Sequence, residues 1–246
     1  MSNEQPILDV QSITVQYKTD KSLHTAVYKV SFQVFKEERT VIVGQSGCGK
    51  STIMKAVGAN IPLTDGRILL NGKPLLKPTI DVMNVFQESD QLCAWKTVLD
   101  NVMFPLLTAR KLKKDVARER AIDYISKVKL TDHIHKFPHE LSGGMKARVG
   151  IARGLAVEPS ILAMDESFGA LDAITKRQMQ DELRQLLDST KATLLFITHD
   201  ITEAVRLGTR ILVLSAHPGQ VVAELQGNSS GEDLALEKKI HALLKH

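Results

Sequence analysis

The segment GQSGCGKST, Gly44 to Thr52, combines closely spaced glycines with a lysine and hydroxyl side chains. It follows the apolar run TVIVG, which predicts a strand, and precedes a helical pattern up to Val57. Glycines let the backbone wrap closely, so that successive N–H groups point at phosphate oxygens. Lys50 supplies positive charge, and Ser51 supplies a ligand for Mg²⁺. The spacing therefore predicts a phosphate-binding loop with a magnesium ion beside it.

Two carboxylates follow the apolar run ILAM, which predicts a buried strand. Asp165 is suited to hold magnesium through the water shell of the ion, and Glu166 can point at the water that attacks a γ-phosphate. Paired acids after a strand also occur as plain caps of the next loop. Because a phosphate-binding loop accompanies this pair, the hydrolytic interpretation is the stronger one.

The segment LSGGMKAR, Leu141 to Arg148, predicts a helix that opens with Ser142, Gly143 and Gly144. A serine hydroxyl and exposed backbone N–H groups at a helix start form an anion site. This second site has neither the lysine nor the magnesium ligand of the first loop. Together the two segments resemble the ATP-binding subunits of ABC transporters, and the resemblance covers nearly the whole chain.

In that family, the signature serine and glycines of one subunit close over ATP held by the glycine loop of the other. Two nucleotides are thereby enclosed in a head-to-tail dimer. The resemblance implies ATP and Mg²⁺ as cofactors and a second copy of the chain as a partner. It implies a nucleotide site formed by Tyr17, Gly44, Gln45, Ser46, Gly47, Cys48, Gly49, Lys50, Ser51, Thr52, Ser142, Gly143, Gly144 and Asp172.

Four further motifs match the family in order along the chain. Gln87 in VFQESD resembles the glutamine that senses magnesium and the attacking water, and Asp172 in FGALD resembles the loop residue that communicates across the dimer. His199 in FITHD resembles the histidine that contacts the γ-phosphate, and Tyr17 in VQYKT resembles the aromatic residue that stacks on adenine. The resemblance thus implies catalytic roles for Glu166, His199 and Gln87, and magnesium ligation by Ser51, Gln87 and Asp165.

The sequence departs from the family at a few positions. Met145 and Ala147 stand where many members carry glutamines, and Ser167 replaces a proline that commonly follows the catalytic glutamate. Losing that proline frees one φ angle and is expected to affect the turnover rate but not the reaction. Cys48 falls at a variable position between required glycines, which favours a tolerated small residue over a redox switch.

The aromatic assignments are the least specific ones. Tyr17, Tyr28 and Phe32 all lie on predicted strands, where an aromatic side chain is more often part of the core. Trp95 is interpreted either as lining a groove that receives a short cytoplasmic helix of a permease or as a core tryptophan. The sequence leaves these alternatives open.

The elements around these motifs predict an α/β fold, and the resemblance implies that this fold is of the P-loop NTPase (ABC ATPase) type. ILDVQSITVQY and AVYKVSFQVFK predict an N-terminal antiparallel β subdomain, and TVIVG, ILAMD, TLLFIT and RILVLS predict a mostly parallel core sheet. The pattern KKDVARERAIDYISKVKL predicts an inserted α-helical lobe over about residues 88–158. The expected domains are an ATP-binding domain, residues 1–226, and a C-terminal linker with a short helix, residues 227–246.

Composition excludes several other classes of protein. The 246 residues are 43% hydrophobic and 24% charged, and no apolar run approaches the roughly 20 residues that span a bilayer. The N-terminus lacks the pattern of a secretory signal, and a net charge of +4 selects no partner. We expect no binding to nucleic acid, a location at the cytoplasmic face of the inner membrane, and contact with the membrane only through separate permease subunits.

Two functions compete within the family: a transporter subunit, and a soluble ABC ATPase acting in DNA repair, chromosome structure or translation. Soluble types tend to carry coiled coils, zinc modules or two cassettes, and the sequence has no such pattern. A monomeric P-loop kinase or GTPase would leave LSGGM unexplained. QESDQLCAWKTVLDNV, FGALDA and SAHPGQVV resemble importers of nitrate, sulfonate or taurine, bicarbonate and pyrimidine precursors. The prediction is an importer ATPase working with permease subunits and a solute-binding protein, its solute unidentified.

Overall fold

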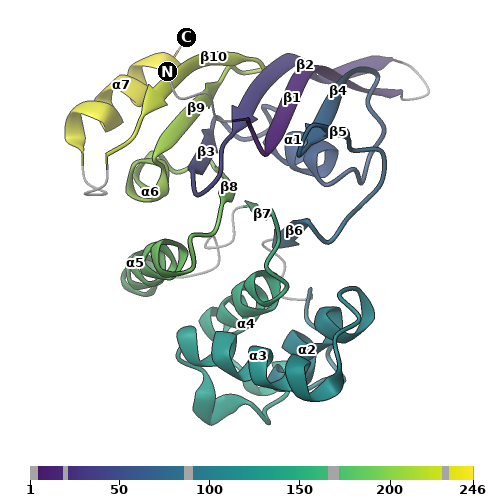
Figure 1. Cartoon of the computed structure of the whole chain (residues 1–246). Helices are drawn as coiled ribbons and strands as arrows, with labels where there is room; N and C mark the ends of the chain where they lie inside the picture. Colours follow the sequence, from purple (N-terminus) through teal and green to yellow (C-terminus); the bar gives the residue numbers. More distant parts are fainter. Residues whose placement is uncertain (1–4, 19–21, 86–90, 166–171, 229–232, 246) are drawn as a thin grey trace. The chain divides into compact units, whose positions relative to one another are not determined.

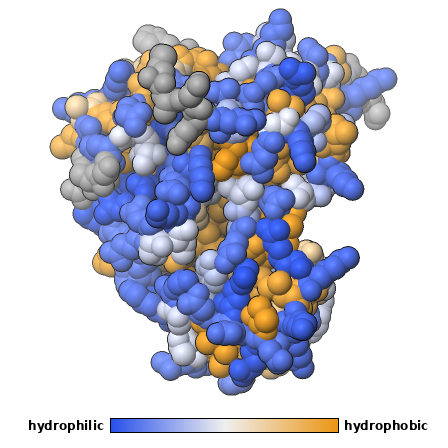
Figure 2. Space-filling model, viewed as in Figure 1, coloured by the Kyte–Doolittle hydropathy of each residue, from blue (hydrophilic) through white to orange (hydrophobic). Residues whose placement is uncertain are grey.

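A computed structural model of the chain describes residues 5–18, 22–85, 91–165, 172–228 and 233–245. The chain folds into two compact units, one formed by residues 1–82 and 193–246 and the other by residues 83–192 (Figure 1). Within the described ranges, no helix is both long enough and apolar enough to cross a membrane. Hydrophilic side chains cover most of the surface seen in Figure 2, with smaller hydrophobic areas between them.

The first unit contains an antiparallel sheet with the strand order β2-β1-β4-β5. In its register Leu8 lies opposite Val34 on one side and Leu70 on the other, and all three side chains are buried. This sheet confirms the antiparallel β subdomain that the sequence predicts. Its strands are β1 (Leu8–Lys18), β2 (Leu23–Val34), β4 (Asp65–Leu70) and β5 (Lys73–Pro74).

The other sheet of this unit is mostly parallel. Strand β3 pairs in parallel with both β8 and β9, and β10 pairs with β9 in the antiparallel direction. Every residue of β3 and of β8 is buried, and the apolar runs over residues 41–43 and 194–197 are typical of strands that are covered on both faces. The elements are β3 (Arg39–Val43), β8 (Leu194–Thr198), β9 (Arg210–Leu214), β10 (Val221–Gln226), α1 (Lys50–Val57), α6 (Ile201–Leu207) and α7 (Leu234–Leu244).

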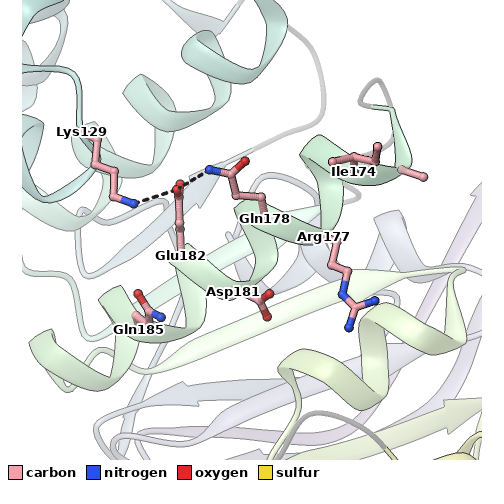
Figure 3. Close-up of a pocket in the computed structure, with 8 residues that line it drawn as sticks. Lys129, Ile174, Arg177, Gln178, Asp181, Glu182 and Gln185 are labelled. Atoms are coloured by element: carbon pink, nitrogen blue, oxygen red, sulfur yellow. Dashed lines mark hydrogen bonds and ion pairs between the residues drawn. The ribbon is translucent and has the colours of Figure 1, made fainter.

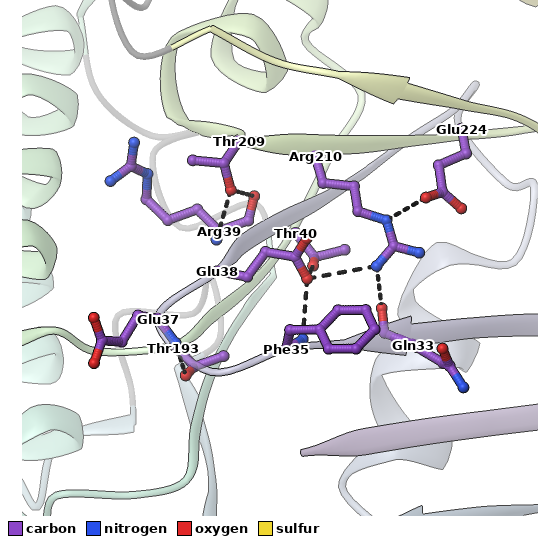
Figure 4. A network of polar contacts seen from close by, with 10 residues as sticks. All are labelled: Gln33, Phe35, Glu37, Glu38, Arg39, Thr40, Thr193, Thr209, Arg210 and Glu224. Atoms are coloured by element: carbon purple, nitrogen blue, oxygen red, sulfur yellow. Dashed lines mark hydrogen bonds and ion pairs between the residues drawn. The ribbon is translucent and has the colours of Figure 1, made fainter. Parts of the chain in front are cut away.

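A polar network around Arg210 joins the two sheets of the first unit (Figure 4). The Nε atom of Arg210 lies 2.5 Å from Oε1 of Glu224 in β10, and Nη1 donates to the carbonyl of Gln33 in β2 at 2.5 Å. Nη1 also lies 3.4 Å from Oε2 of Glu38. Burial lowers the pKa of Arg210, but the contacts with Glu224 and Glu38 outweigh it and the pKa is raised. The half-buried Arg210 side chain therefore links the sheet that contains β3, the strand before the glycine loop, to the sheet that carries Tyr17.

The second unit is mainly helical. Helices α2, α3 and α4 pack against one another, and Val102, Leu106, Ala121, Ile125 and Leu155 are buried among them. These helices confirm the inserted helical lobe. The elements are β6 (Val82–Val85), α2 (Val98–Thr108), α3 (Lys114–Lys127), η2 (Thr131–His133), η3 (Pro138–Glu140), α4 (Gly143–Ala156), β7 (Ile161–Asp165) and α5 (Ala173–Thr190).

Candidate functional site

The glycine loop lies in the first unit, between the buried strand β3 and the start of helix α1. Gly47 and Gly49 have φ values of 81° and 97°, in the left-handed region that favours glycine. Gly49 is the N-cap of α1, and no side chain of the described residues caps this helix. A helix start without a side-chain cap, preceded by a tightly wound loop, is suited to bind an anion.

Lys50 places a buried positive charge at this loop. The side chain is 5% exposed, and Nζ donates to the carbonyls of Gly44 and Gln45 at 2.9 Å each. These two bonds fix the ammonium group against the start of the loop. Ser51 is exposed and Thr52 is half-buried in the first turn of the helix. A buried cation beside exposed hydroxyl groups fits a phosphate with an associated metal ion.

Packing by the rest of the first unit explains the glycines of the loop. A Cβ atom on Gly49 would lie 2.5 Å from the carbonyl oxygen of Ala26, and one on Gly44 would lie 2.7 Å from Sγ of Cys48. Gly219 also approaches the loop so closely that an added Cβ would meet the Cys48 carbonyl oxygen at 2.1 Å. Gly44 and Gly49 therefore lie against other atoms of the chain, and larger residues do not fit at these two positions, whereas residues 45–47 are exposed.

The C-terminal helix reaches the same loop. The side-chain amide of Gln45 donates to the carbonyl of Leu244, the last residue of α7, at 2.6 Å. Helix α7 packs on α6 and β9 in the first unit. This hydrogen bond places Leu244 beside the glycine loop.

Tyr17 is the residue predicted to stack on a nucleotide base, and the structure separates it from the other strand aromatics, Tyr28 and Phe32. The hydroxyl of Tyr17 lies 3.4 Å from Oγ1 of Thr52, so this ring stands beside the glycine loop with 40% of its surface exposed. Phe32 is buried in the sheet, and Tyr28 lies under the ammonium group of Lys29. Tyr17 is the candidate that the fold brings to the loop.

Two histidines near the loop were not predicted from the sequence. His24 lies opposite Tyr17 in the pairing of β1 with β2, and its ring centroid is 6.0 Å from that of His217. Nε2 of His217 would lie 3.3 Å from a Cβ atom on Gly47. The motif SAHPGQVV contains His217, but its place beside the loop depends on contacts between residues far apart in sequence. Sequence patterns carry no signal for such contacts.

His199 is exposed at the end of strand β8. The residues on either side of it are anchored, because the Asp200 N–H donates to Oγ1 of Thr198 at 3.0 Å and the Thr198 hydroxyl contacts the carboxylate of Glu203. Oδ1 of Asp200 also caps α6 by accepting from the N–H groups of Thr202 and Glu203. The backbone at His199 is therefore held firmly, while its ring reaches the surface.

Asp165 lies in the second unit, half-buried at the end of strand β7. The four preceding residues of this strand are 0% exposed, as the sequence predicts for a buried strand that ends in a carboxylate. Glu166 and Gln87 lie outside the described residues. Their predicted roles remain predictions.

The signature segment opens helix α4 in the second unit. Oγ of Ser142 caps the helix by accepting the Met145 N–H at 3.3 Å. Ser142 and Gly143 are exposed, and among the described residues a Cβ atom on Gly143 would meet no atom within 4 Å beyond its chain neighbours and its own helix backbone. This helix start is therefore open to a ligand or a partner.

Asp172 begins helix α5 of the same unit. Its Oδ1 atom accepts from the N–H groups of Ile174 and Thr175 at 3.2 and 3.0 Å. Hydrogen bonds from the Thr175 side chain and backbone lower the pKa of Asp172 from its ordinary value. The side chain is exposed and carries a negative charge at neutral pH.

Known proteins are similar to this chain in both sequence and fold. The ABC transporter family model matches residues 27–169. A taurine import ATP-binding protein of Rhizobium johnstonii is 45% identical over 216 residues, which are 88% of this chain and 81% of that protein. A bicarbonate transport ATP-binding protein of Synechocystis is 40% identical over 89% of this chain and 77% of that protein.

The fold comparison agrees with the sequence comparison. The dimeric structure of an ATP-binding cassette bound to ADP and Pi has a TM-score of 0.78 and 28% identity, covering 90% of this chain and 99% of that one. This likeness confirms the predicted fold class. The chain belongs to the ABC transporter family.

Proposed function

We propose that this chain is the ATP-hydrolysing subunit of a bacterial importer, coupling ATP binding and hydrolysis to the movement of a small solute through separate permease subunits. The observation that carries the proposal is the presence of two unlike helix starts, each suited to bind an anion. One follows the glycine loop and carries the buried Lys50, and the other is the exposed helix start at Ser142. The relatives named as import proteins favour an importer over a soluble ABC ATPase.

In the proposed site, the glycine loop binds the phosphates of ATP. Lys50 and the N–H groups at the start of α1 contact the phosphate oxygens, and Tyr17 stacks on the adenine base. Ser51, Gln87 and Asp165 would hold Mg²⁺, which neutralises phosphate charge when it is bound. Thr52, in the first turn of α1, would also contact the phosphates. The other residues of the loop that would contact them are Gln45, Ser46, Gly47 and Cys48.

Hydrolysis then requires a correctly placed water and a contact to the γ-phosphate. Glu166 orients the water and accepts its proton, and His199 donates to the γ-phosphate. The anchored residues on either side of His199 support this role, because a fixed backbone keeps the ring in place without reorganisation.

A second copy of the chain completes each site. Ser142, Gly143 and Gly144 of one copy cover the ATP that is held by the loop of the other, and Asp172 communicates between the copies. The exposure of this helix start supports the arrangement. So does the dimeric form of the related cassette bound to ADP and Pi.

The permease is expected to dock near Trp95. This side chain is 77% exposed in the turn before α2, so the interpretation as a core tryptophan is wrong. Phe104 and Leu107, on α2, are also exposed, and the Lys96 ammonium lies over the Phe104 ring. An exposed aromatic and aliphatic surface suits the insertion of a short permease helix.

With a permease bound there, the subunit would work at the cytoplasmic face of the inner membrane. A solute-binding protein would deliver a small solute similar to taurine, a sulfonate, nitrate, bicarbonate or a pyrimidine precursor.

The variant Glu166→Gln tests hydrolysis and dimer formation together. It should keep ATP binding, lose turnover, and sediment as a dimer in ATP with Mg²⁺ but as a monomer in ADP. Sedimentation velocity measures the mass, and phosphate release measures the turnover. Normal turnover by this variant would remove the role given to Glu166.

Ser142→Arg in the Glu166→Gln background is the matched second variant. The bulky cation at the open helix start should prevent dimer formation, whereas ATP binding to the loop of the monomer should persist. A closed dimer formed by this double variant would contradict the proposed shared site.

A further inference from the structure

A carboxylate in the second unit connects segments that the proposed function does not link. Oε2 of Glu182, on helix α5, lies 2.8 Å from Nη2 of Arg148 on helix α4. Oε1 of Glu182 lies 3.0 Å from Nζ of Lys129, just after α3, and accepts from Nε2 of Gln178 at 3.1 Å. Figure 3 shows Lys129 and Gln178 converging on Glu182, while Arg177 and Asp181 lie apart from these contacts.

These contacts differ in strength. The side chains of Glu182 and Arg148 are 20% and 21% exposed, whereas that of Lys129 is 66% exposed. A hydrogen-bonded ion pair that is largely shielded from water is stronger than an exposed pair, which contributes little. Arg148 is therefore the principal partner of Glu182.

The Arg148–Glu182 pair connects the two helices that begin after Ser142 and Asp172. Arg148 belongs to the helix that begins after Ser142, and Glu182 belongs to the helix that begins after Asp172. Each of these two capping residues starts an exposed segment that would face the second copy. The Arg148–Glu182 pair fixes the helix behind one segment to the helix behind the other.

We propose that Glu182 is a positioning residue for closure of the dimer: through Arg148 it holds α4 in register with α5, so that Ser142 and Asp172 meet the second copy together. This role rests on the proposed function. Glu182 itself touches neither the nucleotide nor the second copy. Its loss should weaken dimer closure and leave the glycine loop as it is.

The test uses full-length protein carrying Glu166→Gln, with and without Glu182→Gln. At saturating ATP and Mg²⁺, sedimentation equilibrium should show the dimer dissociation constant rising about tenfold on loss of the charge pair. The same substitution in the monomeric Ser142→Arg protein should leave the dissociation constant for ATP unchanged. A purely structural defect would change both constants.

Two controls keep the result interpretable. Asp123→Asn removes the exposed Asp123–Lys127 pair of α3, whose atoms are 2.6 Å apart, and should leave dimer closure unchanged. Arg148→Glu should weaken closure as Glu182→Gln does. The exchange Arg148→Glu with Glu182→Arg should restore closure to within about threefold, since it restores the pair with reversed charges.

The possible results distinguish a failure of the role given to Glu182 from a failure of the proposed function. Wild-type closure by Glu182→Gln, weakened ATP binding by the monomer, or failure of the charge exchange to restore closure in a folded protein would overturn the role of Glu182. If the Glu166→Gln protein forms no dimer in ATP, the proposed function fails instead, before Glu182 is tested.

Discussion

The glycine loop and the signature segment both place glycines at the start of a helix, yet their surroundings are opposite. A Cβ atom on Gly49 would overlap the Ala26 carbonyl at 2.5 Å, whereas one on Gly143 would meet no described atom within 4 Å. The chain's own packing explains the glycine of the loop. The described residues outside the helix give no packing reason for Gly143, and in the proposed function a second copy of the chain would approach it.

The two helix starts also differ in how they are capped and charged. Helix α1 begins at Gly49 beside the buried Lys50, whereas α4 begins at Ser142, whose hydroxyl satisfies the Met145 N–H. The loop is therefore suited to bind an anion with its own charge and backbone. In the proposed function, the signature would add polar groups to a ligand that the loop of the second copy holds.

The largest expected effect is the loss of ATP affinity when the positive charge of Lys50 is removed from the glycine loop. Lys50→Ala should weaken ATP binding roughly a hundredfold, since losing one partner of a buried charge pair costs about 3 kcal/mol. Titration calorimetry with a non-hydrolysable ATP analogue measures this. Lys55→Ala, at an exposed position later in α1, is the matched control and should bind as the wild type does. Equal losses in both variants would contradict the role of Lys50.

The same substitution in both segments tests the comparison directly. Gly49→Ala should lower Tm by roughly 5–10 °C, because the left-handed backbone and the overlap with Ala26 both oppose it. Gly143→Ala should leave Tm within about 2 °C of the wild type, since alanine favours a helix. In the Glu166→Gln background, Gly143→Ala should raise the dissociation constant of the dimer. Equal thermal shifts in the two variants would end the distinction between an enclosed and an open helix start.

A smaller effect is expected from the cap of the open helix start. Ser142→Ala removes the acceptor for the Met145 N–H and should destabilise the protein by about 1 kcal/mol, or roughly 2–4 °C in Tm. Calorimetry measures the shift, and Ser142→Asp should restore most of it because aspartate also caps helices. A stable Ser142→Ala protein with unchanged Tm would show that the cap contributes nothing to folding.

The smallest expected effect concerns the two cysteines. Cys48 is 1% exposed within the loop, whereas Cys93 in the second unit is half-buried. A thiol reagent should label Cys93 first, and Cys48 at least about tenfold more slowly, because its labelling requires the loop to open. Mass spectrometry of Cys93→Ser and the wild type separates the two rates. Equal rates would mean that the loop is less enclosed than its packing indicates.

The sequence predicts those features that depend on local patterns. The glycine loop, the buried strand before Asp165 and the helix after Ser142 each follow from residue types within a short window, and all three are present. Long-range contacts have no such pattern. His217 beside Gly47 and Arg148 beside Glu182 are set by the folding of segments far apart in the chain.

The exposure of Trp95 could not be predicted for a related reason. A tryptophan in a turn before a helix has the same local pattern whether the helix packs over it or leaves it in solvent. The structure decides this by leaving 77% of the side chain exposed. The roles of Gln87 and Glu166, which lie outside the described residues, still rest on motif spacing.

The exposed Trp95 also gives the protein a built-in optical label. It is the single tryptophan among the 246 residues, so all indole fluorescence comes from this one turn of the second unit. An indole in water emits at longer wavelength than one in an apolar surrounding. Binding of a permease peptide over Trp95 would therefore shift the emission to the blue, and unmodified protein can report its own docking in a cuvette.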